Sequence, residues 1–350
     1  MKTIKQFGKK YVGSFVMLIV LMTITYYFIF RQCDLSELID IIYSAKKRYL
    51  VYGVIMMFVH IAGEGVCLRV LGNSLNVTVG FIRSFCYACI DVYYCGITPS
   101  ATGGQPVLAY YMSKDDIPIG KSTIVILLYT VSYKIVLLAL GIVVFVFHRD
   151  FILHNGNAVL ALFIIGIIMN IIIVGICLLC MYNRNAVRGL VTKTIGLLAK
   201  IRIMKHPERK LEAFYEHIEE YHQSAYFIKE NRSVLVKVFV ITLIQRIAMF
   251  SIAYFVYRSF GLQEHNVFDI IALQVVISIT VDSLPLPGAV GVSEGMFWLL
   301  YNQIYVSEML APAMLLSRGI AFYFCLLLCG VVTIVYHIAT VNARKVLKGE

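Results

Sequence analysis

The sequence predicts an all-α polytopic membrane protein with about six full transmembrane helices and two re-entrant hairpins broken by proline and glycine. Three observations favour this class. Of the 350 residues, 60% are hydrophobic and 15% are charged, whereas soluble domains have about 45–50% apolar and about 25% charged residues. The mean hydropathy is +0.81. Several uncharged runs reach the roughly 20 residues that a bilayer core requires. This composition excludes an ordinary soluble enzyme, a disordered protein and a disulfide-stapled secreted module.

The six expected spans are residues 11–30, 49–70, 122–147, 158–182, 234–260 and 312–340. The first run is too long for the core of a signal peptide and shows no small-residue cleavage site, so we expect it to be retained. Between the fourth and fifth spans, residues 183–233 form basic amphipathic segments typical of helices that lie on the cytoplasmic membrane surface. The whole chain is therefore expected to be one integral membrane domain.

Charge predicts the orientation in the cell membrane. Four lysines within residues 2–10 and three basic residues within residues 344–348 flank the ends of the chain. Because cytoplasmic loops carry an excess of Lys and Arg, both termini are expected to be cytoplasmic. The rule is weaker at Lys46, Lys47 and Arg48, which fall on the first connector expected outside.

The basic excess and the cysteines suggest no nucleic-acid or metal chemistry. The chain has 31 Lys and Arg against 20 Asp and Glu, a formal charge of +11. These cations lie beside apolar runs, which indicates membrane phospholipids as partners rather than nucleic acid. Cysteines occur in apolar stretches without zinc-site spacing. We therefore expect no metal and no cofactor.

Two remaining apolar segments, residues 80–112 and 268–305, are interrupted by proline and glycine. Such breaks release backbone groups that lipid cannot satisfy, so they must be buried in protein or line a wet cavity. A Pro-x-x-x-Gly pattern occurs in both, and opposite entry of the two segments predicts an inverted repeat. The alternative is two ordinary kinked spans. The loop residues expected to shape or gate a site are Pro99, Gly103, Gly104, Pro285, Pro287, Gly288 and Gly291.

These two loops carry a resemblance to a known family. The stretches Pro99-Ser-Ala-Thr-Gly-Gly-Gln-Pro106 and Pro285-Leu-Pro-Gly-Ala-Val-Gly-Val-Ser-Glu294 resemble the signature loops of the lysylphosphatidylglycerol synthase transmembrane family, or flippase-like domain proteins. The resemblance covers nearly the whole chain. Some members carry a soluble C-terminal domain that transfers lysine from tRNA to phosphatidylglycerol. This chain ends ten residues after Thr340, so no such domain is expected. The resemblance then implies movement of lipids between leaflets.

Charged residues inside apolar segments are the candidate substrate-binding residues, because each costs about 2.5–3.5 kcal/mol at mid-membrane. They are Glu64, Asp91, Lys134, Arg246, Asp282, Glu294 and Arg318. The cations offer a point charge and a fork of donors to a lipid phosphate. The carboxylates could meet an amine-bearing headgroup or carry a coupling proton. The alternative is that the two signs pair to hold the bundle together. No catalytic residue is expected.

The sequence therefore favours translocation of a phospholipid, aminoacyl-phosphatidylglycerol among them, or of another anionic lipid-linked substrate across the cytoplasmic membrane. One alternative is a phosphatidylglycerol lysyltransferase that uses lysyl-tRNA. The other is a membrane docking partner of a separate soluble aminoacyltransferase, bound through residues 183–233. A homodimer is suggested by analogy alone.

Overall fold

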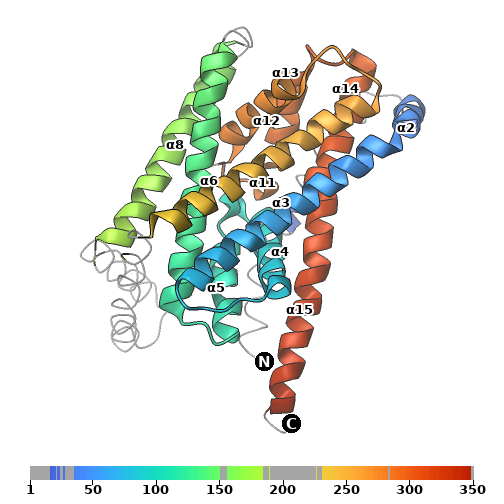
Figure 1. Cartoon of the computed structure of the whole chain (residues 1–350). Coiled ribbons are helices and arrows are strands. Elements are labelled where there is room, and N and C mark those ends of the chain that lie inside the picture. Colours follow the sequence, from blue (N-terminus) through green and yellow to red (C-terminus); the bar gives the residue numbers. More distant parts are fainter. Residues whose placement is uncertain are drawn as a thin grey trace.

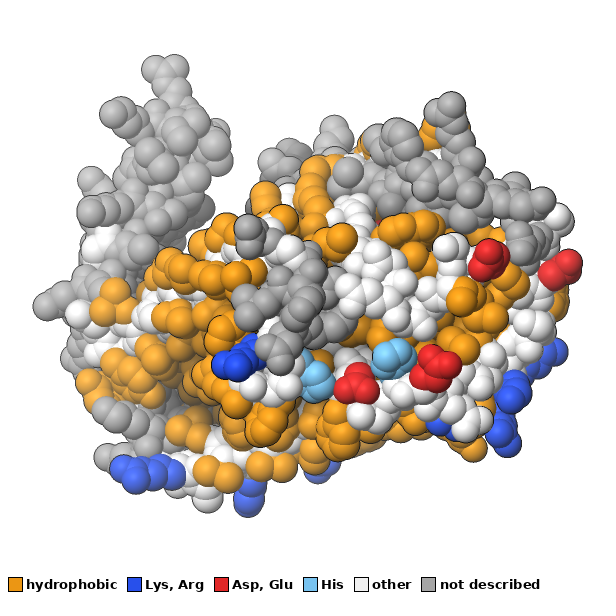
Figure 2. All heavy atoms as spheres, turned by 90° about the horizontal axis from the view of Figure 1, so that it is seen from above, with side chains coloured by type: hydrophobic (Ala, Val, Ile, Leu, Met, Phe, Trp, Pro, Cys, Tyr) orange, Lys and Arg blue, Asp and Glu red, His pale blue; other side chains and the backbone are white. Residues whose placement is uncertain are grey.

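The computed structural model describes residues 16–20, 22–23, 27, 35–149, 156–183, 189, 226, 231–282 and 284–347. Within these residues all regular structure is helical and no strand occurs, which confirms the predicted all-α class. Five helices in this part of the chain are long and apolar enough to cross a membrane. Figure 2 shows that hydrophobic side chains cover much of the described part of the face seen there.

Four of the long helices agree with the predicted spans within a few residues. They are α3 (Lys47–Ser74), α6 (Ile119–Phe147), α8 (Asn157–Tyr182) and α11 (Arg232–Ser259). The first predicted span, 11–30, and the segment 183–233 lie largely outside the described residues. A short helix, α2 (Leu35–Ser44), precedes α3 and packs against α14.

The last predicted span, 312–340, is longer and less regular than expected. It begins as α14 (Ser307–Arg318), passes through a π-helical turn, η3 (Gly319–Phe324), and continues as α15 (Cys325–Leu347). The helix thus begins five residues before the expected boundary and contains Pro312. Pro312 is the sixth residue of α14, so it removes the backbone bond to the carbonyl of Glu308, one turn beyond the positions where proline fits a helix best.

Both Pro/Gly-rich segments are broken where the sequence predicts. The first is α4 (Phe81–Ile97), the 3₁₀ turn η1 (Pro99–Ala101) and α5 (Gly104–Lys114). The second is α12 (Val267–Val281), the 3₁₀ turn η2 (Pro287–Ala289) and α13 (Val292–Tyr301). In each segment the two helices pack against each other.

The two turns have nearly the same backbone. Both begin with proline, and their second residues, Ser100 and Gly288, have φ of 52° and 58°. Ala101 and Ala289 follow, each with φ of 50°. Each half of the chain has the order long helix, broken pair, long helix. The start of α14 follows the start of α6 by 188 residues, and the same offset separates the two turns. The chain therefore contains an internal repeat in element order, while its inverted orientation in the membrane stays a prediction.

The halves meet along α3 and α11 and at the two turns (Figure 1). The two helices are antiparallel, because Lys46 N donates to Ser259 O at 2.8 Å at one end and Cys67 Sγ contacts Val238 O at 3.8 Å toward the other. Gly63 allows the close approach, since a Cβ there would lie 2.8 Å from Gln245 Cβ. The space enclosed by the two halves contains the candidate site.

Candidate functional site

A cavity of about 540 Å³ lies between the two halves. Side chains from α3, α4, η1, α5, α6, α8, α11, η3 and α15 line it, together with the residue that follows α12. Its volume falls in the range of about 300–1,000 Å³ typical of small-molecule sites. Five of the seven predicted charged residues line this cavity: Glu64, Asp91, Lys134, Arg246 and Asp282.

Arg246 on α11 places a guanidinium in the cavity wall that forms no ion pair among the described residues. Its guanidinium stacks on the ring of Tyr133 on α6, with Cζ 3.8 Å from the ring centroid. Among the described residues its buried Nε has no hydrogen-bond partner, and no acidic group lies within ion-pair distance of the guanidinium. Glu64, Asp91 and Asp282 interact with it electrostatically without forming an ion pair. Because a guanidinium without a close ion pair is costly away from water, an anionic ligand group in contact with it would be stabilised.

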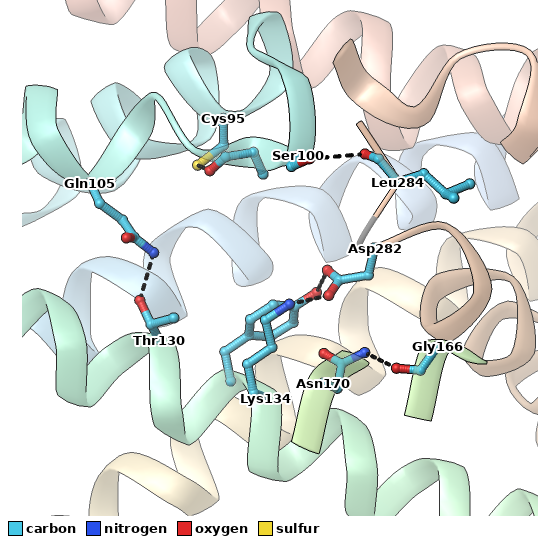
Figure 3. Close-up of polar contacts among 11 residues, drawn as sticks. Cys95, Ser100, Gln105, Thr130, Lys134, Gly166, Asn170, Asp282 and Leu284 are labelled. Carbon is cyan, nitrogen blue, oxygen red and sulfur yellow. Dashed lines mark hydrogen bonds and ion pairs between the residues drawn. The ribbon is translucent and has the colours of Figure 1, made fainter. Parts of the chain in front are cut away.

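Lys134, four turns into α6, is already engaged (Figure 3). Its Nζ forms an ion pair with the carboxylate of Asp282, which also accepts a hydrogen bond from the Tyr133 hydroxyl. Lys134 is 7% exposed, so this is a buried pair. It ties the segment that follows α12 to α6. The two cavity cations therefore differ: Lys134 is paired with Asp282, whereas Arg246 forms no ion pair in the part of the chain that the structure describes.

Glu64 and Asp91 bring two carboxyl groups to the same cavity. Glu64 is 3% exposed, and its Oε2 accepts a hydrogen bond of 2.8 Å from the Tyr129 hydroxyl, which in turn accepts from Gln245 Nε2 at 2.9 Å. Glu64 Oε1 has no partner among the described residues. Asp91 interacts electrostatically with Glu64 and with Arg246. Arg246 and these two carboxyl groups thus form one polar part of the cavity wall.

Glu294 and Arg318 lie outside this cavity and hold the second loop. Arg318 Nε donates to Glu294 Oε1 at 2.9 Å, and its terminal nitrogen donates to Gly288 O at 3.1 Å. Glu294 Oε2 accepts from the backbone N–H of Gly291 at 2.7 Å, at the start of α13. Arg318 also borders a smaller cavity of about 140 Å³. For this pair the structure matches the pairing alternative, in which opposite charges hold the bundle together.

The two loops contribute unequally to the cavity wall. Ser100, Ala101 and Thr102 line it, next to the predicted loop residues Pro99, Gly103 and Gly104. Ser100 Oγ donates to Leu284 O at 3.4 Å, so the two loops touch (Figure 3). The cavity wall includes none of the residues predicted in the second loop, which are Pro285, Pro287, Gly288 and Gly291.

Several polar lining residues were not among the sequence candidates. Tyr129, Tyr133 and Thr130 lie on the cavity side of α6, and Gln105 Nε2 donates to Thr130 Oγ1 at 2.9 Å. His60 also lines the cavity, and its Nδ1 has no partner among the described residues. The available signal is the spacing of Tyr129 and Tyr133. They are four residues apart in an apolar span, just before Lys134, and this spacing places them on one helix face.

Comparisons with known proteins agree with this architecture. Residues 12–329 match the family described as lysylphosphatidylglycerol synthase TM region. The matched residues include both loops and the residues that line the cavity. A UPF0104 membrane protein of Archaeoglobus fulgidus is 21% identical over 261 residues, covering 73% of this chain and 76% of that protein. A UPF0104 membrane protein of Methanothermobacter thermautotrophicus is 20% identical over 318 residues, covering 88% of this chain and 91% of that protein.

Proposed function

The chain belongs to the lysylphosphatidylglycerol synthase TM region family, and from this premise we propose that it moves a phospholipid, or another anionic lipid-linked molecule, between the leaflets of the cytoplasmic membrane. The charged headgroup makes such movement costly, because it must cross the hydrocarbon core in which the acyl chains already lie. A translocating protein must therefore give the headgroup a polar site within the depth of the membrane.

The single observation that carries the proposal is the position of the Arg246 guanidinium in the cavity. It lies in a cavity walled by apolar candidate spans, at the fifteenth residue of a 28-residue helix, and it has no ion-pair partner among the described residues. A phosphate diester presents two oxygens to the fork of a guanidinium, which is a strong and directional pair. The cavity volume suits a headgroup while the acyl chains stay in the bilayer.

Lys134 and Asp282 suggest how binding would reach the loops. A phosphate in the cavity competes with the Asp282 carboxylate for the Lys134 ammonium. Asp282 directly follows α12 and begins the segment that leads to η2. Loss of the pair would release this segment from α6, so headgroup binding favours a rearrangement at the meeting point of the loops. This step is part of the proposal and makes the cavity a gated site.

Lipid movement in proteoliposomes tests the function. The purified chain is reconstituted with a trace of headgroup-labelled phosphatidylglycerol, and an impermeant quencher is then added. We expect loss of more signal than the outer-leaflet share, and a rate at least about tenfold lower for Arg246→Gln, equivalent to about 1.4 kcal/mol.

The matched control is Arg232→Gln, which removes an exposed cation from the first position of the same helix. It should leave the rate unchanged. An Arg246→Gln protein that folds and moves lipid as fast as the parent would refute the role of this residue. The proposal would be refuted if liposomes with the parent chain lost no more signal than empty liposomes. This comparison is made with phosphatidylglycerol and with its aminoacylated form.

Each of the two alternatives has its own test. A lysyltransferase would form lysyl-phosphatidylglycerol from lysyl-tRNA, and a docking partner would retain a soluble aminoacyltransferase through residues 183–233. That segment lies largely outside the described residues, so no geometry favours either alternative here.

A further inference from the structure

A second feature lies away from the central cavity, at the start of α3. Lys46, Lys47 and Arg48 are consecutive and exposed, and among the described residues no acidic side chain pairs with them. Figure 2 shows Lys and Arg side chains gathered at the right-hand edge, the end of the molecule where α2 lies in Figure 1. These three cations are the ones that fit the expected topology least well, so they call for another explanation.

An apolar groove begins at Lys47, the one of these three cations that lines it. It has a volume of about 470 Å³ and lies between one face of α3 and the end of α14. Lys47 is at its edge, and its walls include Val51, Ile55, Phe58 and Ile320. The α3 positions recur every three or four residues, so they form a continuous stripe along the helix. Apart from Lys47, every residue lining the groove is hydrophobic.

Aromatic rings mark the depth of the cation cluster. The ring centroids of Tyr49 and Tyr52 are 6.1 Å apart, and Tyr52 lies 5.7 Å from Phe255 of α11. The guanidinium of Arg48 lies 4.8 Å from the Tyr49 ring centroid. Tyrosine belts of this kind lie at the headgroup level of membranes. Phe58 follows Arg48 by ten residues, or about 15 Å along the helix, so the groove extends into the hydrocarbon.

The groove and the central cavity both border the π-helical turn η3. Ile320 lines the groove, whereas the next two residues of the π-helical turn, Ala321 and Phe322, line the cavity. π-helical turns occur frequently at functional sites because they displace part of a helix wall. Neighbouring residues of one irregular turn therefore border the groove and the cavity.

We propose that the groove and the cations at its head form a binding site for one anionic phospholipid of the membrane. The phosphate lies against Lys47 at the edge of the groove, with the positive charges of Lys46 and Arg48 beside it in the chain, and one acyl chain occupies the stripe on α3. Clustered cations beside a span attract anionic headgroups and leave zwitterionic ones less favoured. The site is distinct from the Arg246 cavity and does not require that the protein transport lipid.

Fluorescence quenching can test this site because the chain has one tryptophan, Trp298. In a Trp298→Phe background, a new tryptophan is placed at Val51 in the groove or at Ile165 on α8. Both positions are 55% exposed. Each protein is reconstituted in phosphatidylcholine vesicles that contain a small fixed fraction of brominated lipid, either phosphatidylglycerol or phosphatidylcholine.

At Val51→Trp we expect brominated phosphatidylglycerol to quench at least about twice as strongly as brominated phosphatidylcholine, and at Ile165→Trp we expect equal quenching. Replacing Lys46, Lys47 and Arg48 together by Gln should abolish the preference at Val51→Trp. Lys47→Gln alone, a milder change, should reduce it. Equal quenching by the two lipids at Val51→Trp, or a preference that survives the Gln substitutions, would overturn the proposal. Arg246→Gln should retain the preference, which separates this site from the proposed transport.

Discussion

At the scale of single residues, the cavity shows that two cations with the same sequence signal have different roles. Lys134 and Arg246 both lie deep in apolar spans, yet Lys134 is paired with Asp282 and Arg246 stacks on Tyr133 without an ion-pair partner among the described residues. Hydropathy cannot distinguish these cases, because it registers the cost of each charge and not the group that compensates it. Stability measurements can distinguish them.

Asp282→Asn should destabilise the protein, because it leaves the buried Lys134 ammonium without its counter-ion. Removal of one partner from a buried pair costs about 3–5 kcal/mol. Arg246→Gln should cost much less, since no described ion pair is broken. Thermal unfolding in a single detergent would compare both with Glu264→Gln, an exposed carboxylate control. Equal unfolding temperatures for Asp282→Asn and the control would show that the pair does not stabilise the fold.

At the scale of elements, the second loop needs glycine at position 288. Gly288 has φ of 58°, and a Cβ at this position would lie 2.1 Å from Phe322 Cζ. Its counterpart in the first turn is Ser100 with φ of 52°, so the turn shape itself tolerates a side chain. The requirement for glycine at 288 thus comes mainly from the close approach of η2 to η3.

Gly288→Ala should therefore lower the unfolding temperature, with a cost of about 1–2 kcal/mol for the left-handed backbone in addition to the contact with Phe322. Gly295→Ala is the control, since a Cβ there meets nothing within 4 Å. Combination of Gly288→Ala with Phe322→Leu should recover part of the loss. If Gly288→Ala and Gly295→Ala unfold at the same temperature, the packing of η2 on this ring is not needed for stability.

At the scale of the whole molecule, the repeat in element order connects the fold to the expected topology. The structure places the start of α3 beside the end of α11 and brings the two broken segments together at their turns. An inverted repeat requires that these segments enter the membrane from opposite sides. Accessibility from the two sides of the membrane tests this arrangement directly.

An impermeant maleimide should label Tyr43→Cys in intact cells, because residue 43 precedes α3 on the connector expected outside. It should label Thr78→Cys, in the loop between α3 and α4, only after permeabilisation. Both parent side chains are exposed, and the unsubstituted chain measures the contribution of its native cysteines. Labelling of Thr78→Cys in intact cells with protection of Tyr43→Cys would show that the protein has the reverse orientation.

The sequence by itself determined the helical class, four of the long spans within a few residues and the positions of both breaks. These features are local, because hydropathy over about 20 residues and the backbone limits of proline and glycine act within one segment. Only the tertiary structure decided that five of seven charged candidates share a cavity, while Glu294 and Arg318 form a pair elsewhere. Partners such as Lys134 and Asp282 are 148 residues apart, so their meeting depends on how helices pack.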